Sequence, residues 1–302
     1  MWDILSQAFG FVAIIILGYA LKKIGFFKEE DFTVLSKITI RITLPGAIIT
    51  SFSEQSFDPA LLSLVLLGLG GGIIYIIVAF LINLKSDKEK KAFDVLNLPG
   101  YNIGCFTLPF ARGFLGPVGV IATSIFDTGN AVVCLGGSFG IASGVKSGSR
   151  FSVKRLGKAL LTSVPFLCYI LMVILNFANI RLPSPVLSCA RTIGNANAFV
   201  AMLTIGVGFK LNGDKRQIGY IVKMLCIRYG IAAILAATAY FLLPFPLEIR
   251  QALVILFFSP IGAAVPPFTR EIDGDVGLSS ALNSICIVCS IVIIVTLLSV
   301  ML

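Results

Sequence analysis

Residues 98–110 read LPGYNIGCFTLPF and interrupt an apolar segment that is otherwise long enough to cross a membrane. Pro99 and Pro109 each remove a backbone donor and clash with the preceding helical turn. Residues 259–268 read SPIGAAVPPF and are interrupted in the same manner. Backbone groups freed at membrane depth are tolerated only where protein or a wet cavity satisfies them. The two stretches therefore predict broken membrane helices that border such a cavity.

The composition of the whole chain supports a membrane location. Hydrophobic residues make up 57% of the 302 residues and charged residues 13%, with a mean hydropathy of +0.98. Soluble domains are nearer 25% charged, so we expect an all-α membrane protein. The net charge of +9 lies mainly between apolar runs, which is typical of membrane topology and not of nucleic-acid binding.

Ten apolar segments are long enough to span a bilayer. They cover residues 4–24, 33–53, 61–84, 92–114, 117–142, 157–178, 184–209, 217–242, 248–270 and 276–300. Most of the lysines and arginines lie in the odd-numbered connections, which are therefore predicted to be cytoplasmic. This orientation places both termini outside the cell (inner) membrane of a multi-pass protein.

The basic connection at 143–158 separates five segments on each side, so we expect a first repeat at 1–142 and a second at 159–302. An odd number of spans per repeat makes the two repeats inverted. The broken helices then occupy spans four and nine, the fourth position of each repeat. Paired interruptions of this kind point to the binding site of a transporter.

The polar residues near the breaks are candidates for substrate binding. Half-helix N-termini offer open N–H groups that suit an anion, and the Asn102 side chain both donates and accepts hydrogen bonds. Asn102 could alternatively join helices as a structural hydrogen-bonding residue. The predicted substrate-binding residues are Asn102, Gly100, Tyr101, Gly104, Pro109, Pro260, Val265, Pro266 and Asn195.

An acidic side chain inside the fifth segment is a candidate for coupling. Asp127 could carry a proton, coordinate Na⁺, or form a buried ion pair with Arg41 or Arg228. Asn130 follows three residues later, on the same helix face. We assign Asp127, Asn130 and Arg41 to ion or proton coupling. The chain contains no histidine and no recognisable phosphate-binding loop, nucleophile elbow or metal cluster. An enzyme, a metal site and a cofactor are therefore not expected.

Several of these motifs resemble the auxin efflux carrier family of secondary transporters. Asn102-Ile103-Gly104 with Pro109 is similar to the element of the family's fourth span, and Asp127-Thr128-Gly129-Asn130 is similar to the element of its fifth. The block formed by Pro260, Pro266, Pro267, Gly274-Asp275 and Ser279-Ser280 resembles the family's ninth and tenth spans. Many members have an asparagine in the ninth-span crossover, where this sequence has Val265 and small residues.

The resemblance implies a fold of two inverted five-helix repeats, shared with the bile acid–sodium symporters, and is compatible with a homodimer. It also implies a secondary active transporter that moves a small organic anion by alternating access. Family substrates are malonate- or malate-like carboxylates and auxin-like compounds, with Na⁺ or H⁺ as the coupling ion. The alternatives are a sodium-coupled symporter of the bile acid type and a non-transporting membrane sensor or channel.

Overall fold

The structure, a computed structural model, describes residues 2–54, 58–210 and 217–302, with side chains from residue 6 onward. Within these ranges it contains helices and no strand, so the predicted all-α class is confirmed. The α-helices are α1 (Trp2–Lys23), α2 (Asp31–Ile38), α3 (Leu44–Glu54), α4 (Leu64–Ile82), α5 (Lys88–Asn97), α6 (Leu108–Val132), α7 (Ser138–Ser147), α8 (Val153–Leu161), α9 (Val164–Phe177), α10 (Ser184–Asn195), α11 (Asn197–Gly208), α12 (Ile218–Leu242), α13 (Leu247–Phe257), α14 (Val265–Glu271) and α15 (Val276–Met301). Four short helical turns join some of them: η1 (Thr39–Thr43), η2 (Pro59–Ser63), η3 (Ile103–Thr107) and η4 (Val133–Gly137).

Among the residues that the structure describes, six helical stretches are long and apolar enough to cross a membrane on their own. They are Ser6–Lys23, Asp31–Glu54, Pro59–Ile82, Ile103–Ser147, Ile218–Leu242 and Val276–Met301, and α8 with α9 would form a seventh if their 69° bend lay within one span. The protein is therefore a multi-pass membrane protein, whereas the count of ten spans stays a prediction.

Helix breaks account for the difference between these stretches and the ten predicted segments. Segment 184–209, which is not among the spanning stretches, is divided at Ala196 into α10 and α11. Segments 92–114 and 248–270 are interrupted at 98–102 and 258–264, as their prolines predict. Segment 157–178 is not one straight helix, because α8 ends before Pro165 and α9 continues at a 69° bend. Gly116, with φ 61° and ψ −155°, interrupts the helical path between segments 92–114 and 117–142.

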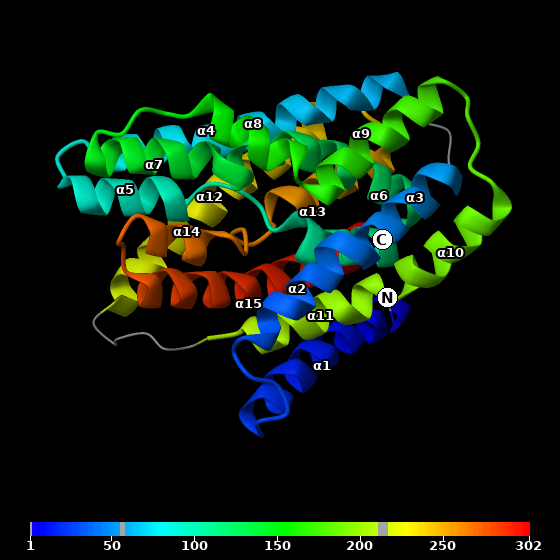
Figure 1. Cartoon of the computed structure of the whole chain (residues 1–302), viewed down its shortest axis with the longest axis horizontal. Helices are drawn as coiled ribbons and strands as arrows, with labels where there is room; N and C mark the ends of the chain where they lie inside the picture. Colours follow the sequence, from blue (N-terminus) through cyan, green and yellow to red (C-terminus); the bar gives the residue numbers. More distant parts are fainter. Residues whose placement is uncertain (1, 55–57, 211–216) are drawn as a thin grey trace.

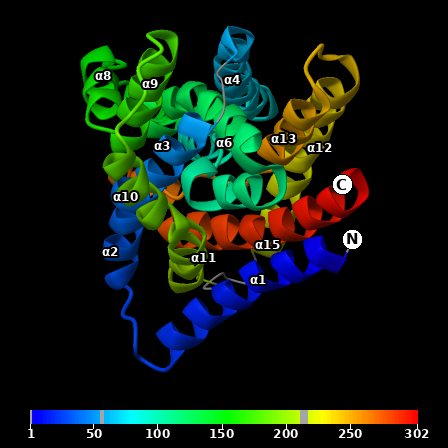
Figure 2. The ribbon, with the colours of Figure 1, turned by 90° about the vertical axis from the view of Figure 1, so that its right-hand side faces the viewer.

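The connections of the chain are segregated along the molecule. Figure 1 shows the α4–α5, α7–α8 and α14–α15 connections at the left, whereas the α9–α10 connection lies at the right. Both ends of the chain lie near each other on the right in Figure 1 and again in Figure 2. The strongly basic connections thus share one end of the molecule.

Glycines allow pairs of long helices to approach closely. A Cβ atom added to Gly68 of α4 would lie 2.0 Å from the backbone oxygen of Phe126, and one added to Gly129 of α6 would lie 1.9 Å from that of Val65. In contrast, a Cβ atom on Gly70 would meet nothing within 4 Å. The close contact of α4 with α6 therefore depends on the position of each glycine and not on glycine content alone.

We expect Gly68→Ala to lower the free energy of unfolding by about 1–3 kcal/mol, because the added methyl group meets backbone that cannot rotate away. Gly70→Ala is the matched control and should leave stability unchanged or raise it, since alanine favours helix over glycine by roughly 1 kcal/mol. Thermal unfolding of both variants in one detergent measures the difference. Equal midpoints would contradict the close contact between α4 and α6.

Candidate functional site

The two interrupted segments meet in the middle of the molecule. The Asn102 backbone N–H donates to the Pro260 carbonyl at 2.8 Å, which joins the break after α5 to the break after α13. Gly100 makes the first break possible because its φ of +82° lies in the left-handed region. The structure thus brings together two stretches that sequence reasoning had matched only by their positions in the two halves.

One buried arginine from α12 holds both breaks. The Arg228 guanidinium is 1% exposed, and its Nη1 donates to the Leu98 carbonyl. Its Nη2 donates to the carbonyls of Gly100 and Ser259, each at 2.8 Å. These carbonyls follow the C-terminal ends of α5 and α13, where helix geometry leaves acceptors without partners and the helix dipole favours a cation.

The surroundings of Arg228 contain aromatic faces in place of an acidic partner. The guanidinium carbon lies 5.1 Å from the ring centre of Tyr75 and 5.6 Å from that of Tyr101, within cation–π range. The interpretation of Arg228 as an ion-pair partner of Asp127 is therefore wrong. Its guanidinium instead donates hydrogen bonds to backbone carbonyls that lack helical partners at the two breaks.

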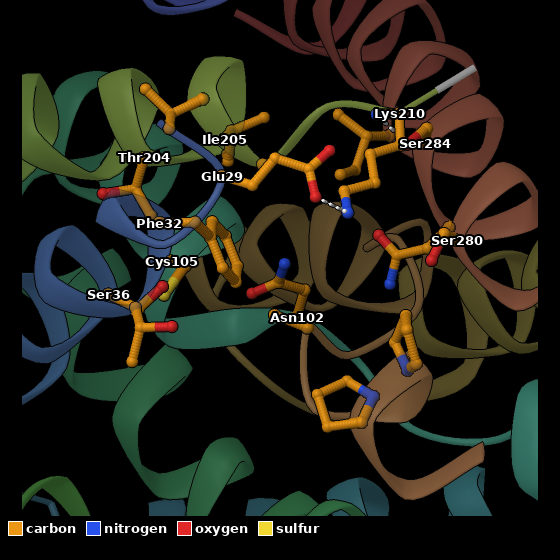
Figure 3. A pocket seen from close by; sticks show the side chains of 18 of the residues that line it. Glu29, Phe32, Ser36, Asn102, Cys105, Thr204, Ile205, Lys210, Ser280 and Ser284 are labelled. Carbon is orange, nitrogen blue, oxygen red and sulfur yellow. Dashed lines mark hydrogen bonds and ion pairs between the residues drawn. The ribbon is translucent and has the colours of Figure 1, made fainter. Parts of the chain in front are cut away.

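A cavity of about 360 Å³ reaches the crossing from the end that carries the basic connections. Its lining comes from α2, the first break with η3, α11, the second break with α14, and α15, and it includes Phe32, Ser36, Asn102, Cys105, Thr204, Ile205, Pro266, Ser280, Asn283 and Ser284. Figure 3 shows the Asn102 side chain directed into this space. Among the described residues no hydrogen bond to the Asn102 amide is found, so the amide is available to a ligand.

A second asparagine faces the same cavity from α15. The Asn283 Nδ2 donates to the carbonyls of Gly262 at 3.1 Å and Ile261 at 3.3 Å, both in the second break. Asn283 is not among the site residues predicted from the sequence. Its place on an uninterrupted helix gave no local signal, yet its amide joins α15 to the second break.

Charged side chains border the wide end of the cavity. The Lys210 Nζ pairs with the Glu29 Oε2 at 2.7 Å, across the space shown in Figure 3, and Arg270 is a further lining cation. The hydrogen bond and the positive charge of Lys210 lower the pKa of Glu29. Glu29 is largely exposed, so this pair contributes little to stability. The lining therefore includes two cations, Lys210 and Arg270, and two carboxylates, Glu29 and Glu30, of which Glu29 pairs with Lys210.

A smaller cavity of about 150 Å³ borders the same crossing and contains the predicted coupling residues. Asn102, Cys105 and Ala263 line both cavities. The Asn130 Oδ1 accepts from the Tyr101 N–H at 3.0 Å, and its Nδ2 donates to the Asp127 Oδ1 at 2.8 Å.

Asp127 is surrounded by neutral donors. Besides the amide of Asn130, the Tyr169 hydroxyl donates to its Oδ2 at 2.9 Å. No ion pair found among the described residues includes Asp127, so the alternative of a structural ion pair is not supported. Arg41 is exposed and lines neither cavity, so it does not share the smaller cavity with Asp127.

The other predicted substrate residues fall into three groups. Tyr101 and Gly104 line the smaller cavity, and Pro266 lines the larger one. Gly100 and Pro260 form the crossing backbone, while Pro109 and Val265 are buried in helices beside it. Asn195 instead lies at the exposed end of α10, where its Oδ1 accepts from Arg112 at 2.9 Å.

The chain also matches known proteins. Residues 4–144 match the family described as "Membrane transport protein". An uncharacterized transporter of Methanocaldococcus jannaschii is 26% identical over 207 residues, which cover 64% of this chain and 65% of the relative. An uncharacterized transporter of Methanothermobacter thermautotrophicus is 27% identical over 209 residues, which cover 67% of this chain and 66% of the relative. The matched region spans just under two thirds of each relative's length. The broken spans, the Asp127–Asn130 motif and these matches agree: residues 4–144 are similar to the membrane transport protein family, which is the auxin efflux carrier family that the motifs of the chain resemble.

Proposed function

We propose that this protein is a secondary active transporter that moves a small organic anion by alternating access. The observation that carries the proposal is the crossing of the two broken segments, where the Asn102 N–H meets the Pro260 carbonyl and the Asn102 amide faces a cavity. Broken spans at matched positions are the usual place of the binding site in carriers of this kind.

The chemistry of the cavity favours an anion. The helix that starts at Ile103 begins beside the cavity, and the first N–H groups of a helix lack intrahelical acceptors. The amide of Asn102 and the hydroxyls of Ser280 and Ser284 add donors from two sides, while the Nδ2 of Asn283 is already bound to the second break. Lys210 and Arg270 at the mouth would attract negative charge. A malonate- or malate-like carboxylate, or an auxin-like one, fits this set of donors.

We also propose ten spans arranged as two inverted repeats, 1–142 and 159–302, joined by the 143–158 linker. The contacts between helices support this symmetry, because a contact between two helices has a counterpart between the two helices at the matching positions of the other repeat. The contact between α1 and α11 has a counterpart between α9 and α3, and the contact between α4 and α5 has one between α12 and α13. The packing of α4 on the second part of α6 corresponds in the same way to that of α12 on α15.

The distribution of basic connections supports a cytoplasmic location for the mouth of the larger cavity. Lys85, Lys146 and Lys210 belong to connections that are gathered at one end, whereas the two chain ends lie at the other. In this orientation the protein resides in the cell membrane with both termini outside, and its cavity opens inward.

A proton is the coupling ion that the smaller cavity favours. Both oxygens of Asp127 accept from donors, Asn130 and Tyr169, whereas Na⁺ would need additional oxygen ligands directed at the same point. A carboxyl group at membrane depth without a cationic partner is also costly in its charged form. We therefore propose that Asp127 carries the proton and that Asn130 links it to the crossing through Tyr101.

Uptake of labelled malate or malonate into proteoliposomes tests the proposed function. The purified protein should accumulate at least one small carboxylate under an imposed proton gradient, and protein-free vesicles should not. If no carboxylate moves under any proton, sodium or electrical gradient while the protein binds one, a sensor would replace the transporter. Single-channel currents would indicate a channel.

A further inference from the structure

Helix α8 carries two kinds of side chain on different sides. Lys154 and Lys158 are one helical turn apart and share a face, while Val153, Leu156 and Leu160 lie together on another. None of the residues of α8 is buried. Because the transport site lies elsewhere, neither the charge nor the amphipathic pattern of α8 is explained by the proposed function.

The basic side chains of this region have few counter-charges within the protein. Residues 143–163 contain no aspartate or glutamate. Arg155 pairs with Glu271 at 2.6 Å, and the Lys146 Nζ donates to the carbonyls of Ile272 and Asp273. Within the described ranges no ion pair is found for Lys154 or Lys158, which leaves their charges directed outward.

The position of α8 places this charge beside lipid. Figure 2 shows α8 at the edge of the molecule next to α9, and α8 is bent by 69° from that helix. If α9 crosses the bilayer, a helix bent so far from it runs closer to the membrane plane. Val153 is 72% exposed and Phe151 is 44% exposed, so apolar groups accompany the lysines. Interfacial helices combine these features.

We propose that α8 is an interfacial helix whose Lys154 and Lys158 bind the phosphate groups of anionic phospholipids. The complementary charge, the lack of internal counter-ions and the exposed apolar side chains beside the lysines all favour a lipid surface as the partner. Arg155 pairs with Glu271 at the end of α14 and so holds α8 in place, whereas Lys146 of α7 binds the α14–α15 turn. Lys154 and Lys158 remain for the headgroups.

Helix α8 is connected through one ion pair to the point where the two breaks cross. Glu271, the partner of Arg155, is the last residue of α14, and α14 begins at the second break. An effect of anionic lipid on uptake would follow from this connection and rests on the proposed function. Lipid binding itself does not depend on the proposed function, so it is measured separately from transport.

Native mass spectrometry of the purified protein in detergent with added phosphatidylglycerol or phosphatidylcholine provides the test. The wild-type protein should retain phosphatidylglycerol in preference to phosphatidylcholine. Lys154→Gln with Lys158→Gln should weaken that retention roughly tenfold, since each basic residue near an anionic surface contributes a substantial share of the attraction. Lys154→Arg with Lys158→Arg should preserve it, because both charges remain.

Lys85→Gln with Lys88→Gln is the matched control. It removes the same charge from the α4–α5 connection and the start of α5, where Asp87 and Glu89 are neighbours, and it should retain the lipid. Equal retention by the Lys154/Lys158 glutamine variant and the wild type would overturn the proposal, as would equal loss in the control. Complete displacement by inorganic phosphate would instead indicate a soluble ligand. If the glutamine variant retains lipid but loses a dimer, the lysines would contact a second copy of the chain. Displacement by phosphate and loss of a dimer would each overturn the lipid proposal.

Discussion

Replacing Arg228 with methionine is expected to lower the free energy of unfolding by about 3 kcal/mol or more and to abolish uptake. Methionine fills similar space but leaves the carbonyls of Leu98, Gly100 and Ser259 without their donor. Each buried acceptor left unpaired costs about 1 kcal/mol or more. Transport should fail as well, because the guanidinium binds both of the segments that cross at the cavity.

Two further variants distinguish the hydrogen bonds of the Arg228 guanidinium from the effect of its positive charge and from the loss of an exposed arginine. Arg228→Lys retains a cation but cannot present the planar donors that reach three carbonyls, so we expect intermediate stability. Arg181→Met removes an exposed arginine and should change neither measurement. Thermal unfolding in detergent and uptake by proteoliposomes supply the two readouts. Wild-type unfolding and uptake in Arg228→Met would contradict the assigned role of Arg228.

Replacing Asp127 with asparagine is expected to abolish uptake driven by a proton gradient while exchange of substrate across the vesicle membrane continues. Asparagine has nearly the same shape and still accepts one hydrogen bond, but it cannot take up or release a proton. The loss should be roughly a hundredfold or greater, as for other groups that carry out proton transfer directly. Parallel measurements of gradient-driven uptake and of exchange in the same vesicles separate coupling from binding.

Asp58→Asn is the matched control for the Asp127 variant. Asp58 is exposed and accepts the N–H of Ala60 at the start of η2, a role that asparagine also fills. It should leave coupled uptake unchanged. Sodium-dependent thermal stabilisation of the wild type that disappears in Asp127→Asn would contradict proton coupling and favour the sodium-coupled alternative.

Proline chemistry made the central part of the fold predictable. Pro99 and Pro260 remove donors from the backbone at fixed positions, so a break had to follow whatever the surrounding packing. The Asp127–Asn130 pair was also predictable, because residues three positions apart in a helix share a face. The structure confirms that hydrogen bond.

Long-range contacts were not predictable from local patterns. Arg228 lies in an apolar segment, and its sequence context does not indicate that it reaches two breaks 31 and 130 residues away. Asn283 sits in a regular helix, so its direction toward the cavity depends on how α15 packs. Asn195 and Asn197 do not share a helix face, so one of them could face the site, and Asn195 was assigned to it; packing instead turns Asn197 inward and leaves Asn195 exposed.

The proteoliposome uptake of Asn102→Ala, compared with wild type and Asn176→Ala, tests the central claim most directly. Asn176 joins α9 to α3 by donating to the Phe52 carbonyl and lines neither cavity, so it controls for the loss of an interhelical hydrogen bond. We predict that Asn102→Ala raises the KM for the transported carboxylate roughly tenfold, the effect of one lost hydrogen bond, while its unfolding midpoint stays that of the wild type. An unchanged KM in a folded Asn102→Ala protein would contradict a substrate site at the crossing of the two broken spans.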